Sequence, residues 1–208
     1  GATIVLYDRY TERREDVTQN ILSDHDFTLI PPFDHPEVIA GQSTCARELF
    51  EDSGSLDQLI VSVGGGGLIS GSALAAHRVN PKCRVVGVEP EAGNDVQLSL
   101  QQDQIVEIEV PDTIADGQQT TAPGVHTFAV MQQHVDEIVT VTDSQILDAM
   151  DYLFRFQKQI VEPSGACALA AILANNVKIT GSRVGVIISG GNISPERFVE
   201  LMEPTWKI

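Results

Sequence analysis

The chain has 208 residues, of which 42% are hydrophobic and 20% are charged. This composition supplies enough apolar surface for a buried core and excludes a wholly disordered chain. The formal net charge of −16 argues against a nucleic-acid or anionic-membrane binder, because phosphate contacts need clustered Lys and Arg. Cys45, Cys83 and Cys167 are scattered and odd in number, so they predict buried free thiols in a reducing, cytoplasmic compartment.

Short continuous apolar runs, typical of buried parallel strands, recur along the chain. Residues 2–7 (ATIVLY) form one such run directly after Gly1. Chain ends are usually frayed and polar, so this start suggests a piece of a longer chain. Four further strands are predicted at residues 59–63, 85–88, 138–141 and 184–188.

Helix-start signals lie between these runs. Asp34, Pro36 and Glu37 predict a helix that Asp34 caps, and Thr142 and Gln145 have the spacing of a capping box. Further helices are predicted over residues 68–77, over residues 163–173 and after residue 194. Alternating strands and helices predict an α/β fold with a doubly wound, mostly parallel sheet.

Four consecutive glycines, Gly64, Gly65, Gly66 and Gly67, connect a predicted strand to the predicted helix that follows it. Backbone N–H groups can converge there on an anion that no Cβ obstructs, and the helix N-terminus adds a favourable partial charge. A flexible tight turn is the alternative, but ordering four glycines costs much conformational entropy. The sequence therefore predicts a phosphate-binding loop that needs no Lys or Arg.

Two common phosphate motifs do not fit this loop. Gly66 and Gly71 have the spacing of the two P-loop glycines, but Ser72 stands where the motif requires Lys. The dinucleotide fingerprint also lacks its last glycine. Glu89 nevertheless ends the next strand, where a ribose-binding acid would lie. A dinucleotide ligand therefore remains an alternative.

A second glycine loop, formed by Ser189, Gly190, Gly191 and Asn192, follows the last predicted strand. Ligands of doubly wound sheets bind at the carboxyl ends of the strands. Two glycine loops at two such ends predict one ligand that is contacted at two points. Its phosphate would lie at the first loop, and a ring or polar atom would lie near Ser189.

Three segments together resemble the fold-type-II pyridoxal-phosphate enzymes, whose fold is tryptophan synthase β-like. They are residues 62–68 (SVGGGGL), 162–166 (EPSGA) and 189–192 (SGGN). Residues 113–117 (TIADG) and 5–10 (VLYDRY) are similar to the branch that contains serine racemase, serine/threonine dehydratase and 3-hydroxyaspartate ammonia-lyase. These motifs span essentially the whole chain in the expected order.

The resemblance implies a role for each motif. The four glycines would bind the phosphate of pyridoxal 5'-phosphate through backbone amides, and Ser189 would hydrogen-bond the pyridine nitrogen. A neutral hydroxyl does not hold that nitrogen protonated as an aspartate would, so the ring is a weaker electron sink, which favours prompt loss of a β-hydroxyl. Glu162 would lie beside the ring. Its alternative is a helix-start carboxylate next to Pro163.

Residues 89–95 (EPEAGND) carry a second implied site. In the racemase branch, an acid, a backbone carbonyl four residues on and an acid six residues on coordinate a cation. The matching positions are Glu89, Gly93 and Asp95, and all-oxygen ligands suit Mg²⁺ or Ca²⁺. From the residues alone, an acidic turn with Asp95 as a helix cap is the alternative.

Two family segments have no counterpart here. One is the Ser-x-Lys-x-Arg-like segment with the Schiff-base lysine, and the other is the Ser-x-Gly-Asn-His-like segment that holds the substrate carboxylate. The contexts of Lys82, Lys158, Lys178 and Lys207 do not match the first. We therefore expect residues 1–35 to be the tail of the small domain with the crossover, and residues 36–208 to be the large cofactor-binding domain. We also expect no catalytic residue in this chain, and no activity of the chain alone.

The resemblance implies a function for the full-length protein. It would be an ammonia-lyase that converts serine, threonine or 3-hydroxyaspartate to a 2-oxo acid and ammonia, with serine racemisation as the alternative outcome in the same site. The expected partners are a small amino-acid substrate, the missing N-terminal segment and a second copy in a homodimer. An alternative of another class is a non-catalytic nucleotide-binding or regulatory module.

Overall fold

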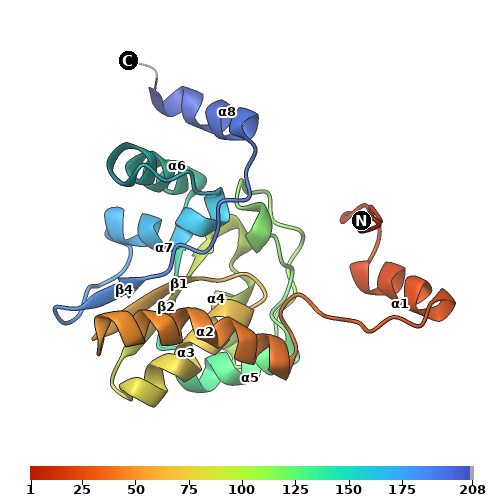
Figure 1. Cartoon of the computed structure of the whole chain (residues 1–208), viewed down its shortest axis with the longest axis horizontal. Helices are drawn as coiled ribbons and strands as arrows, with labels where there is room; N and C mark the ends of the chain where they lie inside the picture. The colour runs from red at the N-terminus through yellow and green to blue at the C-terminus, as the bar shows by residue number, and fades with distance from the viewer. Residues whose placement is uncertain (207–208) are drawn as a thin grey trace. The chain divides into compact units, whose positions relative to one another are not determined.

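The computed structural model describes residues 1–206, and the chain divides into two compact units, Gly1–Pro32 and Phe33–Ile208 (Figure 1). The first unit holds the helix α1 (Arg14–Asp24), which buries none of its side chains. The strand predicted at residues 2–7 is wrong, since these residues are exposed and have no regular structure. A strand needs a neighbour for its N–H and C=O groups, and no described strand pairs with this segment.

A parallel sheet forms the centre of the second unit. Its four strands in the described chain have the order β3-β2-β1-β4. The chain runs outward from β1 to β2 and β3 and then returns to the other side of β1 for β4, so the strand order reverses at β1. Ligands bind at such a switch point in doubly wound sheets. The strands are β1 (Gln58–Ser62), β2 (Arg84–Pro90), β3 (Glu137–Val141) and β4 (Val184–Val186).

The register is set by β1, which pairs with both of its neighbours. Ile60 lies opposite Val86 on one side and Val186 on the other. Leu59 and Val61 point into one core cluster and Ile60 into the other, and all three side chains are fully buried. The continuous apolar run at 59–63 thus reflects a strand that is covered on both faces.

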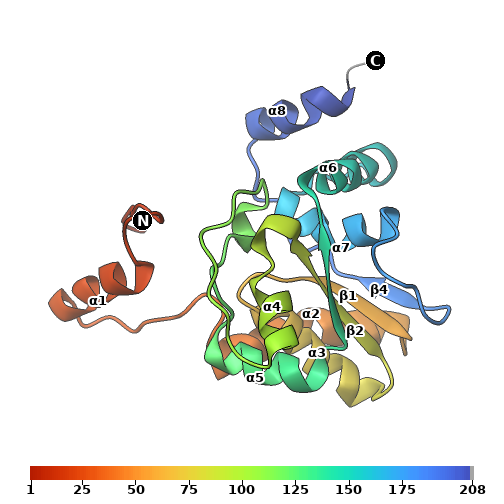
Figure 2. The same cartoon turned by 180° about the vertical axis from the view of Figure 1, so that it is seen from behind.

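Helices cover both faces of this sheet (Figures 1 and 2). One core cluster contains side chains of the first four helices of this unit, and the other contains side chains of the last three. The first group is α2 (Pro36–Ser53), α3 (Gly67–Val79), α4 (Asp95–Gln102) and α5 (Val125–His134); the second is α6 (Asp143–Tyr152), α7 (Pro163–Leu173) and α8 (Pro195–Trp206). The predicted doubly wound α/β class is confirmed.

Short helical turns complete the unit. Two 3-10 turns, η1 (Glu91–Gly93) and η2 (Asp116–Gln118), lie in the loops after β2 and α4. The π-helical turn η3 (Leu153–Gln157) extends α6. The capping box predicted at Thr142 and Gln145 is present at the start of α6.

The cap of α2 differs from the prediction. His35 is the N-cap, and its Nδ1 accepts a hydrogen bond from the Glu37 N–H at 3.2 Å. The Asp34 carboxylate instead accepts from the first backbone N–H groups of α5, which are those of Val125, His126 and Thr127, at 3.0, 2.8 and 3.1 Å. A carboxylate at a helix N-terminus neutralises unpaired amides and the positive end of the helix dipole. Asp34 therefore connects the start of α2 to the start of α5.

The three cysteines are free. Cys83 and Cys167 are buried, as predicted, but Cys45 is exposed on α2, so the prediction of a buried thiol is wrong at this position. Position 45 lies on the solvent side of an amphipathic helix whose buried residues are Ile39, Ala46 and Phe50.

None of the described helices combines the length and the apolar character needed to cross a membrane.

Replacing Asp34 with Ala should destabilise the protein by about 1 kcal/mol, because three α5 amides lose their acceptor. Chemical denaturation of the intact protein measures this loss. The matched control is Asp112→Ala, which removes an exposed loop carboxylate and should leave the free energy of unfolding unchanged. Equal stability of both variants would contradict the cap.

Candidate functional site

The four glycines connect β1 to α3, as predicted. Gly66 is the N-cap of α3 and has φ +94°, a conformation that residues with a side chain rarely adopt. A Cβ on Gly66 would lie 2.8 Å from Met131 Cε and 2.9 Å from Thr127 Cβ, both on α5. A Cβ on Gly65 would overlap the Phe33 ring. The loop therefore has no room for side chains at these two positions.

The backbone carbonyl of Gly65 is hydrogen-bonded, whereas the backbone N–H groups of this loop are not. The Gly65 carbonyl accepts from Thr127 Oγ1 at 2.7 Å and from the Gly124 N–H at 3.5 Å. Within the described part of the chain, the N–H groups of Gly64, Gly65 and Gly66 donate to no protein acceptor. Converging free N–H groups at a helix N-terminus are the arrangement that binds an anion.

The second glycine loop contacts the start of α7. The Glu162 N–H donates to the Gly190 carbonyl at 3.2 Å, and a Cβ on Gly190 would overlap Glu162 Oε1. Ser189 is exposed beside this contact. Gly190 thus lets a carboxylate lie directly against the loop, and two motifs that are well separated in the sequence meet at one place.

Glu162 does not act as a helix cap, although it is the N-cap residue of α7. Its side chain accepts no hydrogen bond from the first turn of that helix. Burial, followed by the negative charge of Asp116, raises the pKa of the Glu162 carboxyl. Glu162 therefore lies at the start of α7, as the helix-start alternative expected, but its side chain makes no capping hydrogen bond.

The loop around η2 joins these groups. The Gly117 N–H donates to Ser164 Oγ at 3.0 Å, and the Gln118 amide donates to the carbonyls of Val63 and Val88 at 2.7 and 3.0 Å. Gln118 thereby ties the carboxyl ends of β1 and β2 to the loop. Sequence analysis missed Gln118, because a single glutamine in a polar loop carries no signal of its burial.

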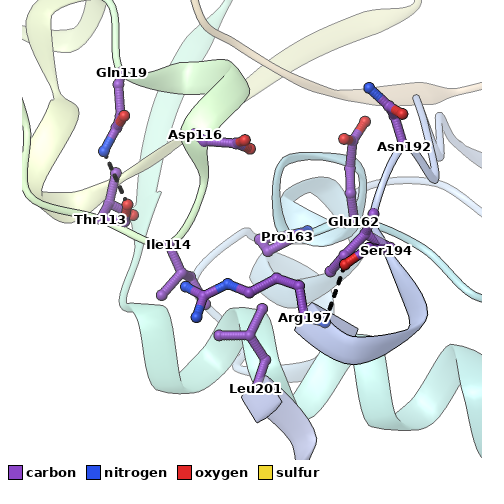
Figure 3. A pocket seen from close by; sticks show the side chains of 11 residues that line it. Thr113, Ile114, Asp116, Gln119, Glu162, Pro163, Asn192, Ser194, Arg197 and Leu201 are labelled. Carbon is purple, nitrogen blue, oxygen red and sulfur yellow. Dashed lines mark hydrogen bonds between the residues drawn. The ribbon is translucent and has the colours of Figure 1, made fainter. Parts of the chain in front are cut away.

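A hollow of about 420 Å³ lies beside Glu162 (Figure 3). Figure 3 shows Asp116 and Glu162 reaching the same opening from different elements, and Arg197 extending from the first turn of α8. No lining residue belongs to the four-glycine loop, so this hollow adjoins the predicted cofactor site without containing the phosphate position. It is lined by Thr113, Ile114, Asp116, Gln119, Glu162, Pro163, Asn192, Ile193, Ser194, Arg197 and Leu201.

Two buried acids lie where the cation site was predicted. Glu89 and Asp95 are each 0% exposed. The Glu89 carboxylate accepts from the N–H groups of Val96 and Gln97 at 3.0 and 2.9 Å, whereas both oxygens of Asp95 are buried without a hydrogen-bond partner. Asp95 is the first residue of α4, whose N-cap is Asn94, so the capping alternative is not supported.

Burial dominates the electrostatics of this pair. Burial, and then the charge of Asp95, raises the pKa of Glu89 well above its ordinary value, although the N–H groups of Gln97 and Val96 act in the opposite direction. Burial raises the pKa of Asp95 to about 7, against the effect of its backbone N–H and of the Thr120 hydroxyl. The Asp95–Thr120 contact does not reach hydrogen-bond geometry, and a buried carboxylate without a full partner is costly. In residues 1–206, no three or more His, Cys, Asp and Glu side chains form a metal-binding group, so a third protein ligand here would be a backbone carbonyl such as that of Gly93.

The described lysines lie away from these groups. Lys82, Lys158 and Lys178 are exposed and do not line the hollow. Lys158 follows η3 in the left-handed region, at φ 59°, and its Nζ donates to the Arg155 carbonyl at 2.7 Å. Lys207 is outside the described residues. That this chain lacks the Schiff-base lysine stays a prediction.

Comparison with known proteins identifies the family. A family model described as "Pyridoxal-phosphate dependent enzyme" matches residues 1–190. The chain is 48% identical over 202 residues to an L-threo-3-hydroxyaspartate ammonia-lyase of Saccharomyces cerevisiae, and 48% identical over 202 residues to a serine racemase of Schizosaccharomyces pombe. The chain belongs to the pyridoxal-phosphate dependent enzyme family, as its motifs indicated.

Solved structures agree with the fold. Maize serine racemase superposes with a TM-score of 0.89 at 35% identity, over 99% of this chain and 64% of that one. A threonine deaminase from T.th. gives a TM-score of 0.83 at 39% identity, over 87% of this chain and 62% of that one. The two yeast alignments cover 97% of this chain and 62% of each relative. The chain thus spans less than two thirds of the length of these relatives.

Replacing Gly66 with Ala should lower the free energy of unfolding by more than about 1 kcal/mol, because the left-handed backbone alone costs that much and the Cβ also meets α5. Gly41→Ala is the matched control. Gly41 lies inside α2, and nothing lies within 4 Å of a Cβ there, so Ala should stabilise the protein by about 0.5–1 kcal/mol. Chemical denaturation should therefore show a lower free energy of unfolding for Gly66→Ala and a higher one for Gly41→Ala. Equal changes in the two variants would contradict close packing around Gly66.

Proposed function

We propose that the full-length protein is a pyridoxal-phosphate dependent ammonia-lyase that acts on β-hydroxy amino acids. The observation that carries the proposal is the four-glycine loop, whose N–H groups are free and whose surroundings exclude side chains. The 48% identity to an L-threo-3-hydroxyaspartate ammonia-lyase supports 3-hydroxyaspartate as a substrate. Serine and threonine remain within the proposed class.

The residues of this chain fit the cofactor. The amides of the four glycines and the N-terminus of α3 would hold its phosphate without any Lys or Arg, which suits a chain with a net charge of −16. Phe33, Thr127 and Met131 pack against the loop and leave no room for a side chain at Gly65 or Gly66. When bound, pyridoxal phosphate supplies an electron sink for negative charge at the substrate α-carbon.

The other end of the site would be formed by the second loop. Ser189 would offer its hydroxyl to the pyridine nitrogen. Burial, and then the negative charge of Asp116, raises the pKa of the Glu162 carboxyl. Carboxyl groups with perturbed pKa values are often found at functional sites, which supports placing Glu162 beside the ring.

Racemisation of serine is the second candidate. The relative called serine racemase in Schizosaccharomyces pombe is as similar to this chain as the ammonia-lyase, at 48% identity. Both reactions begin with loss of the α-proton, and they differ in whether a β-hydroxyl leaves or a proton returns on the opposite face.

The proposal also includes a homodimer and a cytoplasmic location, the latter supported by three free cysteines.

A divalent cation is part of the proposal. Glu89, Asp95 and the carbonyl of Gly93 offer only oxygen ligands, as Mg²⁺ and Ca²⁺ prefer. The two unpartnered oxygens of Asp95 support the presence of a charge partner. A bound cation would stabilise the ionised form of both acids. It would also stabilise the connection that η1 makes between β2 and α4.

The intact protein should show an absorbance band at about 410–430 nm and release ammonia and a 2-oxo acid from 3-hydroxyaspartate, serine or threonine. Gly66→Asp should lose the band, because a side chain and a negative charge enter the anion site. Gly41→Asp introduces the same group on an exposed helix position and should keep it. A folded wild-type protein with neither band nor ammonia release, after incubation with the cofactor, would refute the proposal and favour the non-catalytic module.

Chelator treatment of the intact protein should lower both its melting temperature and its activity, and added Mg²⁺ or Ca²⁺ should restore them. Asp95→Asn should abolish this response, and it should melt higher than wild type under chelator, since a buried unpartnered charge is removed. Asp112→Asn is the control and should respond as wild type does. If Asp95→Asn and wild type respond identically, the cation does not bind at Asp95.

A further inference from the structure

Two histidines meet at the ends of α3 and α5 that are remote from the glycine loop. His77 Nδ1 and His134 Nδ1 are 3.1 Å apart, and the ring centroids are 5.3 Å apart at an interplanar angle of 54°. Both side chains are half-buried, so they remain within reach of solvent. We infer that His77 and His134 together form a binding site for a transition-metal ion of the Zn²⁺, Ni²⁺ or Cu²⁺ type.

The tautomer of His77 is fixed by the backbone. His77 Nε2 lies 3.1 Å from the Cys83 carbonyl oxygen, and a carbonyl can only accept a hydrogen bond. Nε2 therefore carries the hydrogen, and Nδ1 of the neutral ring presents a lone pair. A carbonyl that orients the distal nitrogen is the usual support of a metal-binding histidine. Without metal, His134 Nδ1–H donates to this lone pair, and a metal ion would replace that one hydrogen.

The spacing of the two nitrogens matches a shared metal ion. Zn–N bonds of about 2.0–2.1 Å place two ligands about 3.4 Å apart at a tetrahedral angle and about 2.9 Å apart at a right angle. The observed 3.1 Å lies between these values. The two nitrogens now point at each other across a hydrogen bond, so binding requires both rings to turn until their lone pairs meet at the metal ion. Imidazole nitrogen selects Zn²⁺, Ni²⁺ and Cu²⁺ over Mg²⁺ and Ca²⁺, so this site is chemically distinct from Glu89 and Asp95.

The neighbouring side chains do not complete the coordination. Asp136 Oδ2 accepts from the Val85 N–H at 2.7 Å. The Cys83 thiol is buried, and this burial, with the charge of Asp136, raises its pKa to about 11, which disfavours the thiolate form that binds metal ions. The remaining metal positions would hold water. The site is thus an open two-histidine site, which binds metal only while both imidazoles are unprotonated.

The location gives this site a structural consequence. Both histidines are in the last turn of their helices, where the helix dipole favours a cation. The same two helices meet again at the glycine loop, where Thr127 of α5 holds the Gly65 carbonyl. A metal ion at His77 and His134 would link α3 and α5 at their carboxyl ends, and it would stabilise the pair that forms the anion site.

Titration of the intact protein with Ni²⁺ tests the site. Isothermal titration calorimetry at about pH 7.5 should show one equivalent bound, with a rise in melting temperature that chelator reverses. Both effects should vanish at about pH 5, because protons compete with metal ions for histidine ligands. His77→Gln and His134→Gln should each abolish the binding. His126→Gln, which changes an exposed histidine on the same helix as His134, should retain it. A Cys45→Ser background removes the exposed thiol as a competing ligand.

A second measurement needs no substitution at the pair. In the wild-type protein, paramagnetic Cu²⁺ should broaden the ring-proton NMR signals of His77 and His134 before those of His25, His35 and His126. Two variants distinguish the histidine site from the site proposed at Glu89 and Asp95. Asp95→Asn should keep the Ni²⁺ response, and His134→Gln should keep the Mg²⁺ response. Undiminished Ni²⁺ binding by both pair variants, first broadening at other histidines, or no Ni²⁺ binding by wild type would each overturn the inference.

Discussion

The close packing of α5 and Phe33 against the four-glycine loop is the constraint on which the site depends. A single Cβ at Gly65 or Gly66 would overlap the Phe33 ring or the Met131 and Thr127 side chains. These neighbours also satisfy the Gly65 carbonyl through Thr127 Oγ1, whereas the N–H groups of Gly64, Gly65 and Gly66 keep no acceptor in the described chain. Asp34 fixes α5 in this position through its first turn. The conformation of the loop is thus set by the packing around it as much as by the glycines themselves.

In this acidic chain, the groups in direct contact with a site influence it more than the net charge of the whole chain does. A net charge of −16 opposes anion binding at long range, but screening limits that field to about 8–10 Å at physiological salt. Backbone amides and a helix dipole act at contact distance. At contact distance, burial and then a neighbouring acid raise the pKa of Glu89, beside Asp95, and of Glu162, beside Asp116. Local surroundings therefore outweigh the net charge at each of these groups.

The fold is shared by relatives that bear different activity names. Serine racemase and threonine deaminase structures superpose on this chain with TM-scores of 0.89 and 0.83, and the curated relatives include an ammonia-lyase. The family match indicates the cofactor class, whereas shared backbone geometry does not by itself distinguish activities, because function depends on the groups of each site. His77 and His134 stand apart from the resemblance, because neither belongs to the motifs that carried it.

The sequence by itself determined the sheet, the position of the glycine loop and the family, because these depend on local patterns. Buried parallel strands require apolar runs, and an anion loop requires consecutive glycines, so both are visible in single segments. The strand expected at residues 2–7 failed because a strand exists only through its neighbours. Asp34 was assigned to the nearer helix, although its carboxylate caps a helix that begins 91 positions later. Gln118 and the histidine pair gave no signal in sequence. Only the tertiary structure decided these contacts, since each joins groups far apart in the chain whose approach is set by the packing of whole helices on the sheet.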